Sequence, residues 1–216
     1  MTVTPYALML NDPTTEIMVA WIDERSGADG SAQTLHCDGR EFAADGNATE
    51  NGGIYLYHAI IEGLEPDTLY PVSLDAGETI EFPPIKTLKS RLGDGEFKSL
   101  VVYDTHTVKR QMTEPATFAP MAAEQVDAVF VAGDMIGELD YERNNHNTGI
   151  WATAFRDYFS QLHIEFMPQI LQIPGNHEVG NTMNDGTMLG DATGTLYVDF
   201  SPTFATSSRS IQITRR

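Results

Sequence analysis

The sequence Ile170-Leu171-Gln172-Ile173-Pro174-Gly175-Asn176-His177-Glu178 decides the fold, because a short apolar run passes directly into a turn that carries polar, metal-binding side chains. Two other apolar runs end in the same way. Residues 100–102 precede Asp104-Thr105-His106, and residues 128–131 precede Gly133-Asp134. Short apolar runs rich in branched side chains are typical of buried strands in a parallel sheet. The sequence therefore predicts three such strands, each followed by polar residues.

The segments between these runs have the apolar spacing of helices. We expect one helix at residues 113–125 and another at residues 148–162. The second carries an apolar stripe, which we interpret as part of the core and not as a substrate site: Trp151, Phe155, Tyr158, Phe159 and Leu162. Alternating strands and helices predict an α/β domain with a parallel sheet, and we assign it residues 97–216.

The first 91 residues show a different pattern, in which short strands are separated by turns. The expected strands cover residues 6–10, 16–23, 54–61 and 69–74, with Gly- and Asp-rich breaks between several of them. Closely spaced short strands predict an antiparallel β-sandwich over residues 1–91. The expected domain boundary is a connection rich in Pro, Gly and charged residues, formed by Phe82-Pro83-Pro84 and residues 89–96.

The composition narrows the classes of function. The net charge of −18 argues against binding to nucleic-acid backbones or anionic membranes. Cys37 is the only cysteine, so a disulfide within the chain and a thiolate metal cluster are both excluded. No signal peptide is visible, and no apolar run approaches the ~20 residues needed to span a bilayer. We therefore expect a soluble protein, and its compartment stays open.

Polar side chains follow all three predicted parallel strands. In open α/β sheets, ligands gather beyond the carboxyl ends of the strands, so these side chains are expected to converge. Asp104 and His106 lie two residues apart, and on an extended segment they face the same side. Carboxylate and amide oxygens combined with imidazole suit a pair of transition-metal ions. The sequence thus predicts a metal centre at one edge of the sheet.

The order D-x-H, then G-D, then G-N-H-E resembles the calcineurin-like metallophosphoesterase superfamily, which includes the purple acid phosphatases. The resemblance implies hydrolysis of a phosphate ester at two bound metal ions, which would be divalent or trivalent Fe, Mn or Zn. It also implies a role for each of six residues. Asp104 and His106 would bind the first metal, Asp134 would bridge both metals, Asn176 would bind the second, His177 would protonate the leaving oxygen, and Glu178 would orient that imidazole.

A second motif supports the sandwich. The run Leu64-Glu65-Pro66-Asp67-Thr68-Leu69-Tyr70 resembles the fibronectin type III pattern L-x-P-x-T-x-Y. The resemblance implies that Tyr70 bonds back to the upstream backbone and that Trp21 is a core residue. Purple acid phosphatases carry such a domain before the catalytic one, so the two resemblances agree.

The chain departs from the purple acid phosphatase pattern in two places. The family has a metal-binding Tyr three residues after the second Asp, where this chain has Gly137. The superfamily also takes metal ligands from histidines after the third motif, and none follows His177. We interpret His146 as a residue of a polar loop and His163 as a residue at the end of a helix, and we do not assign either as a metal ligand. The resemblance therefore covers the sandwich and about the first half of the catalytic domain.

Three explanations for the C-terminal departure stay open. Residues 201–216 contain three arginines and no acidic residue, which is unusual for so acidic a chain. The segment could result from a shift of the reading frame, it could reflect a truncated gene model, or it could be a natural short tail.

The predicted function is hydrolysis of a phosphorylated small molecule or other phosphoester, and it has two rivals. One is an inactive or truncated relative that binds metal weakly. The other is a module in which the sandwich binds a partner. The natural substrate and the oligomeric state are not indicated by the sequence.

Overall fold

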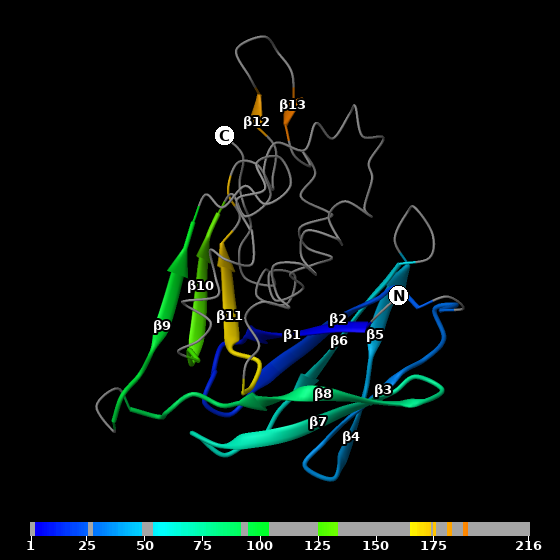
Figure 1. Ribbon diagram of the computed structural model, residues 1–216, viewed down its shortest axis with the longest axis horizontal. Coiled ribbons are helices and arrows are strands. Elements are labelled where there is room, and N and C mark those ends of the chain that lie inside the picture. The colour runs from blue at the N-terminus through cyan, green and yellow to red at the C-terminus, as the bar shows by residue number, and fades with distance from the viewer. Residues whose placement is uncertain are drawn as a thin grey trace.

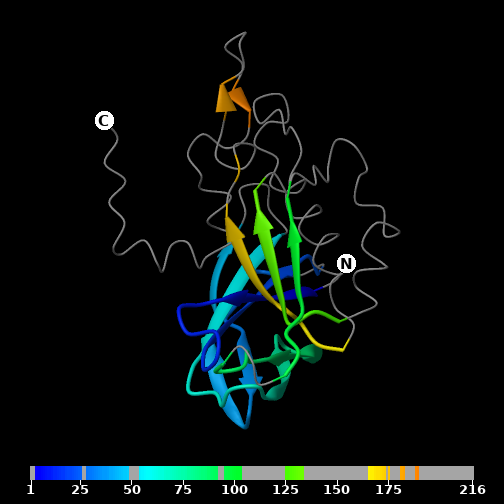
Figure 2. The same cartoon turned by 90° about the vertical axis from the view of Figure 1, so that its left-hand side faces the viewer.

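The computed structural model of the chain describes residues 3–25, 28–48, 54–91, 95–103, 125–133, 165–173, 175, 181–182 and 188–189. Across these ranges all regular structure is β-strand, arranged in two large sheets and one short pair of strands. Figures 1 and 2 show a two-layered sandwich from which three parallel strands extend to one side.

The larger sheet has seven strands in the order β5-β6-β2-β1-β11-β10-β9. The strands from β5 to β1 pair antiparallel, whereas β1, β11, β10 and β9 pair parallel. The bounds are β1 (Val3–Met9), β2 (Ile17–Asp23), β5 (Asp45–Ala48), β6 (Tyr55–Ile61), β9 (Ser99–Val102), β10 (Ala128–Ala132) and β11 (Gln169–Ile173).

The second sheet covers part of the first. Its four strands are antiparallel in the order β4-β3-β7-β8. Their bounds are β3 (Thr34–Cys37), β4 (Arg40–Ala43), β7 (Leu69–Asp75) and β8 (Thr79–Lys86), and the short pair is β12 (Asn181–Thr182) with β13 (Met188–Leu189). The division of β1 to β8 between the two sheets is that of immunoglobulin-like sandwiches. The predicted β-sandwich is therefore confirmed.

The sandwich core is built around Trp21, which is completely buried as the sequence predicts. Its ring stacks on Tyr57 of β6, with centroids 5.7 Å apart, and meets Phe82 of β8 at 6.0 Å. The inner face of β2 presents apolar residues at every second position, which is the period at which strand side chains share a face. One aromatic cluster thus bridges the two sheets.

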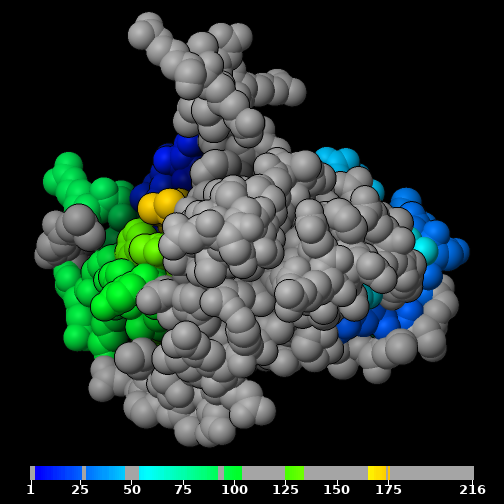
Figure 3. Space-filling model, turned by 90° about the horizontal axis from the view of Figure 1, so that it is seen from above, coloured from blue at the N-terminus to red at the C-terminus, as the bar shows by residue number. Residues whose placement is uncertain are grey.

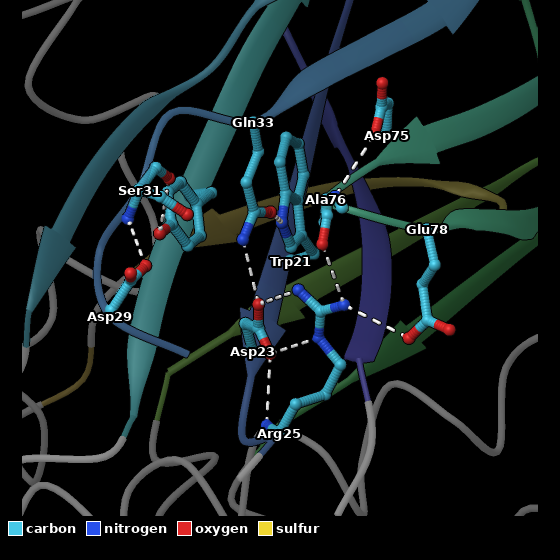
Figure 4. Close-up of polar contacts among 11 residues, drawn as sticks. Trp21, Asp23, Arg25, Asp29, Ser31, Gln33, Asp75, Ala76 and Glu78 are labelled. Atoms are coloured by element: carbon cyan, nitrogen blue, oxygen red, sulfur yellow. Dashed lines mark hydrogen bonds and ion pairs between the residues drawn. The ribbon is translucent and has the colours of Figure 1, made fainter. Parts of the chain in front are cut away.

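Polar groups close one end of this core, as Figure 4 shows. The indole N–H of Trp21 donates to Gln33 Oε1 at 2.7 Å, and Gln33 Nε2 donates to Asp23 Oδ2 at 2.8 Å. Arg25 donates to both oxygens of the buried Asp23 carboxylate, through Nε at 2.9 Å and Nη2 at 2.8 Å. Its other nitrogen, Nη1, donates to Ala76 O at 3.2 Å, so the network reaches the turn between β7 and β8.

The expected tyrosine corner is present. The backbone N–H of Glu65 donates to Tyr70 Oη at 2.7 Å. Tyr70 itself is buried in the sandwich core. This bond fixes the chain where it enters β7, which is the role that the L-x-P-x-T-x-Y pattern predicts.

The interpretation of Phe82-Pro83-Pro84 as part of a connection was wrong, because these residues belong to β8. Proline lacks a backbone N–H and is tolerated in sheets on edge strands or at irregularities. Strand β8 is the edge of its sheet. The two prolines also sit where the register between β7 and β8 shifts, between the pairs Tyr70↔Ile85 and Val72↔Phe82.

The parallel part of the fold agrees with the sequence in its strands. All three predicted runs form strands, and these pair in parallel. Apart from Gln125, the helices expected at residues 113–125 and 148–162 lie outside the described residues, so the helical layer of the α/β prediction stays a prediction. The sheet itself continues across the expected domain boundary, because β1 pairs with β11 through Ala7↔Gln169 and Leu8↔Ile170.

The tyrosine corner gives a first prediction. In Tyr70→Phe the N–H of Glu65 loses its acceptor, and we expect the free energy of unfolding to fall by about 1–2 kcal/mol. Urea denaturation should show a lower midpoint at an unchanged slope. Tyr103→Phe, at a side chain that is 71% exposed, is the control and should change stability by less than ~0.5 kcal/mol. Equal effects of the two variants would contradict the assigned role of Tyr70.

The Asp23–Arg25 pair gives a second prediction, on pH. Burial alone would raise the pKa of Asp23, but hydrogen bonds from Arg25 and Gln33 and the charge of Arg25 outweigh it, so this pKa lies below its ordinary value. The pair therefore contributes fully above the ordinary aspartate pKa of about 3.9, and its contribution falls as the pH drops below that value. Arg25→Gln should lower the free energy of unfolding by roughly 2–4 kcal/mol at pH 7 and by clearly less at pH 3.

The measurement is urea denaturation of the unmodified chain and Arg25→Gln between pH 7 and pH 3. Arg91→Gln is the control, since Arg91 is exposed and its replacement should change stability by less than ~0.5 kcal/mol at every pH. A difference between Arg25→Gln and the unmodified chain that stays constant with pH would refute the predicted linkage.

Candidate metal centre

The carboxyl ends of β9, β10 and β11 lie level with one another. Val131 pairs with Val102 on one side and Gln172 on the other, and Ala132 pairs with Ile173. Figures 1 and 2 show the three arrowheads side by side. In Figure 3, which looks onto this end, the atoms of the three strands adjoin in green, yellow-green and yellow. The parallel pairing therefore places three strand ends at one edge of the sheet.

Each sequence motif begins directly after one of these ends. The described residues reach Tyr103 after β9, Gly133 after β10 and Gly175 after β11. The next residue in each case is the first predicted ligand of its motif, namely Asp104, Asp134 or Asn176. The structure thus brings together the attachment points of the three motifs.

The predicted site residues themselves lie outside the described residues: Asp104, His106, Asp134, Asn176, His177 and Glu178. Within the described ranges there is no group of three or more His, Cys, Asp or Glu side chains that could hold a metal ion. The metal-binding and proton-transfer roles stay predictions, as does the number of metals.

The backbone before Asp134 has a special conformation. Gly133 is buried and has a φ of 79°, in the left-handed region. Side chains rarely tolerate this region, and glycine enters it at no steric cost. Gly133 therefore lets the chain turn sharply off β10 just where the predicted bridging carboxylate follows.

Asp127 holds the opposite ends of the strands, although the sequence analysis did not single it out. Its Oδ2 accepts the backbone N–H of Lys98 at 2.9 Å, and its Oδ1 accepts Lys86 Nζ at 3.0 Å. Burial would lower the pKa of Lys86, but its contacts with Asp127 and Asp67 outweigh this and raise it. The sequence does place Asp127 directly before an apolar run, which could have drawn attention to it. Its partner Lys86 lies 41 residues away on β8, so the sequence pattern does not reveal the contact.

Gln169 fastens β11 to the sandwich. Its side chain is completely buried, and Nε2 donates to Pro13 O at 2.8 Å and Lys86 O at 3.1 Å. Among the described residues, its Oε1 has no hydrogen-bond partner. The backbone N–H of Met167 adds a bond of 2.8 Å to Pro84 O. The strand that precedes the third motif is therefore fixed against both sheets.

A cavity of about 560 Å³ lies at the amino ends of the parallel strands. Its lining includes Lys98 before β9, Asp127 before β10 and Glu165 before β11. It is thus at the opposite edge of the sheet from the candidate metal centre. Lys86 and Asp127 also line the cavity, and they form an ion pair with each other. Because of its location and this pairing, the cavity is not the predicted metal site.

Comparisons with known proteins leave the family open. No protein-family model and no curated protein matches the sequence. Among solved structures the chain is similar to Astrotactin-2, described as a conserved vertebrate-specific and perforin-like membrane protein involved in neuronal development, at 13% identity and a TM-score of 0.28. The match covers 52% of this chain and 24% of the other chain, and it carries no argument about fold or function. Across the described residues, no helix is long and apolar enough to cross a membrane.

The role of Asp127 is open to test by substitution. Asp127→Ala leaves Lys86 and the N–H of Lys98 without their acceptor, and we expect the free energy of unfolding to fall by roughly 2–4 kcal/mol. Asp127→Asn keeps one acceptor oxygen and should cost less. Glu96→Ala, at a nearby exposed position, should stay within ~0.5 kcal/mol of the unmodified chain. Urea denaturation of the three variants is the measurement, and equal losses for Asp127→Ala and Glu96→Ala would contradict this assignment.

Proposed function

We propose that the chain carries a metal-dependent phosphoesterase site at the carboxyl ends of β9, β10 and β11. The observation that supports the proposal is the register of the three strands, which end level and lead directly into Asp104, Asp134 and Asn176. Ligand sites in parallel sheets lie beyond such strand ends. The proposal needs no large rearrangement, because the attachment points of the motifs already adjoin.

The donor set fits two metal ions of the Fe, Mn or Zn type. Asp104 and His106 would offer a carboxylate and an imidazole to the first ion, Asp134 would offer a carboxylate to both ions, and Asn176 would offer an amide oxygen to the second ion. Mixed oxygen and nitrogen ligands suit these metals. When bound, the ions supply Lewis-acid chemistry, which polarises the phosphoryl group and activates water.

His177 would handle the proton of the reaction. Its imidazole would deliver a proton to the leaving alcohol oxygen, a contribution worth roughly 10²–10⁴-fold in rate. Glu178, the next residue, would hold that imidazole in the required orientation. The predicted substrate is a phosphorylated small molecule or other phosphoester, and its repulsion by a chain of net charge −18 would be offset locally by the bound cations.

The two metal positions are expected to differ in affinity. The first ion has three of the named ligands, and the second has only Asp134 and Asn176. Catalytic metal sites usually have at least three protein ligands. We therefore expect weak retention of the second ion, and slow hydrolysis in this chain, because a two-ion mechanism requires both positions to be filled.

Metal binding tests the proposal directly. Calorimetry with Mn²⁺ or Zn²⁺ should show one dominant site, and Asp134→Ala should weaken it at least about tenfold, since a shared carboxylate is lost. Asp45→Ala removes an exposed carboxylate of β5 and is the matched control, which should leave the affinity unchanged. Two equally tight sites, or equal effects of the two substitutions, would refute the assignment of ligands.

Hydrolysis of aryl phosphates completes the test of function. Turnover should require added metal and should fall in His177→Ala by about 10²-fold or more for poor leaving groups, but less for good ones. His36→Ala, at a partly exposed histidine of β3, is the control. Turnover that persists without metal, or that shows no dependence on the leaving group in His177→Ala, would count against the proposed site.

A further inference from the structure

The antiparallel sandwich and the parallel strands meet along β1. In the seven-stranded sheet β1 lies between β2 and β11, so without β11 it would be the edge of the sandwich. Its residues, Val3–Met9, carry no charge, and five of the seven are buried. Natural edge strands are normally protected by charged residues, prolines or bulges. Pro5 is the one such feature of β1, and the pairs with β11 lie beyond it, at Ala7 and Leu8.

Met167, two residues before β11, belongs to the core of the sandwich. It is completely buried in the same cluster as Trp21 and Ile85. It also forms a parallel bridge with Ile85 of β8, and its backbone N–H donates to Pro84 O at 2.8 Å. The core of the sandwich is therefore completed by a residue from outside the predicted sandwich.

Polar groups of the two parts are matched across the same contact. The buried amide of Gln169 donates from Nε2 to Pro13 O and to Lys86 O, which lie on two different segments of the sandwich. In the other direction, Lys86 Nζ reaches Asp127 Oδ1 at 3.0 Å and lies 5.4 Å from the ring centre of Phe166. The contact thus combines main-chain pairing with specific side-chain partners.

Apolar burial also continues across the contact. Paired residues of neighbouring strands point to the same side of a sheet. Met18, Leu8, Ile170 and Val129 form one such row over β2, β1, β11 and β10, and each is at most 1% exposed. Contacts between separate domains are usually more polar than this. The row therefore has the character of a single core.

We propose that β1 and the end of β8 form an acceptor surface for residues 165–173, so that the sandwich and the parallel strands fold as one unit. The occupant is a strand of the same chain, which pairs with β1, places Met167 in the core and gives Gln169 its carbonyl acceptors. The sandwich then does not offer this edge to a separate protein, as an autonomous binding module could. This inference does not depend on the proposed metal centre.

Cleavage of the connection between the two parts tests the proposal. A protease recognition sequence replaces residues 92–94, between the exposed residues Arg91 and Gly95, and the folded chain is cut there. The fragments 1–91 and 95–216 should elute together from a size-exclusion column in buffer and should separate only in denaturant. Fragments that separate in buffer would overturn the proposal.

Two substitutions in the cleavable chain locate the contact. Met167→Ala removes core volume at the junction and should weaken the association of the fragments at least about tenfold. Leu171→Ala is the matched control, because Leu171 lies on β11 beyond the pairs with β1 and is 37% exposed. It should change the association by less than about threefold. Analytical ultracentrifugation over a dilution series gives both dissociation constants, and equal effects would contradict the assigned contact.

Hydrogen exchange in the intact, unmodified chain provides a measurement that needs no substitution. The most protected amides of β2 and of β10 should open with the same free energy and the same dependence on urea, because one unfolding event exposes both strands. Two independently folded parts would give two different free energies of opening. That result would overturn the proposal whatever the cleaved fragments do.

Discussion

The parallel pairing of β1 with β11 is the contact on which the arrangement of the chain depends. Among the described residues, the pairs Ala7↔Gln169 and Leu8↔Ile170 join the antiparallel sandwich to the parallel sheet, and an isolated parallel bridge, Ile85↔Met167, joins β8 to the residues before β11. Gln169 strengthens this narrow contact, since its amide binds the turn before β2 and the end of β8. The ion pair of Lys86 with Asp127 and the hydrogen bond from the Met167 N–H to Pro84 O add to this contact, so the strands that lead to the candidate metal centre are held on the sandwich at several points.

The sequence predicted much of the sandwich. Periodicity located the strands that became β1, β2, β6 and β7, and the motif around Tyr70 predicted a hydrogen bond that the structure shows. It missed β3, β4 and β5, which are only four residues long, and β8, whose prolines resemble a connection. Short strands and edge strands are stabilised by their neighbours, and a local pattern does not contain that information.

The candidate metal centre was also predictable only in part, because the contacts that position its strands join residues far apart in the sequence. Three apolar runs with polar ends predict strand ends, and the parallel register confirms that these ends adjoin. The hydrogen bonds of Asp127 and Gln169 join residues that are 29 to 156 positions apart, and a local stretch of sequence does not reveal such contacts. The six predicted site residues follow from motif order, and their chemistry stays a proposal.

The outer edge of β9 has a consequence for solubility. Among the described strands it is the outermost of the seven-stranded sheet, and Ser99-Leu100-Val101-Val102 contains none of the prolines or charged residues that protect other edges, such as β8. An unprotected apolar edge is a template on which a second chain can add a strand and start a fibre-like aggregate. The net charge of −18 keeps such edges apart through repulsion, and this protection weakens as added salt shortens the screening length below ~10 Å.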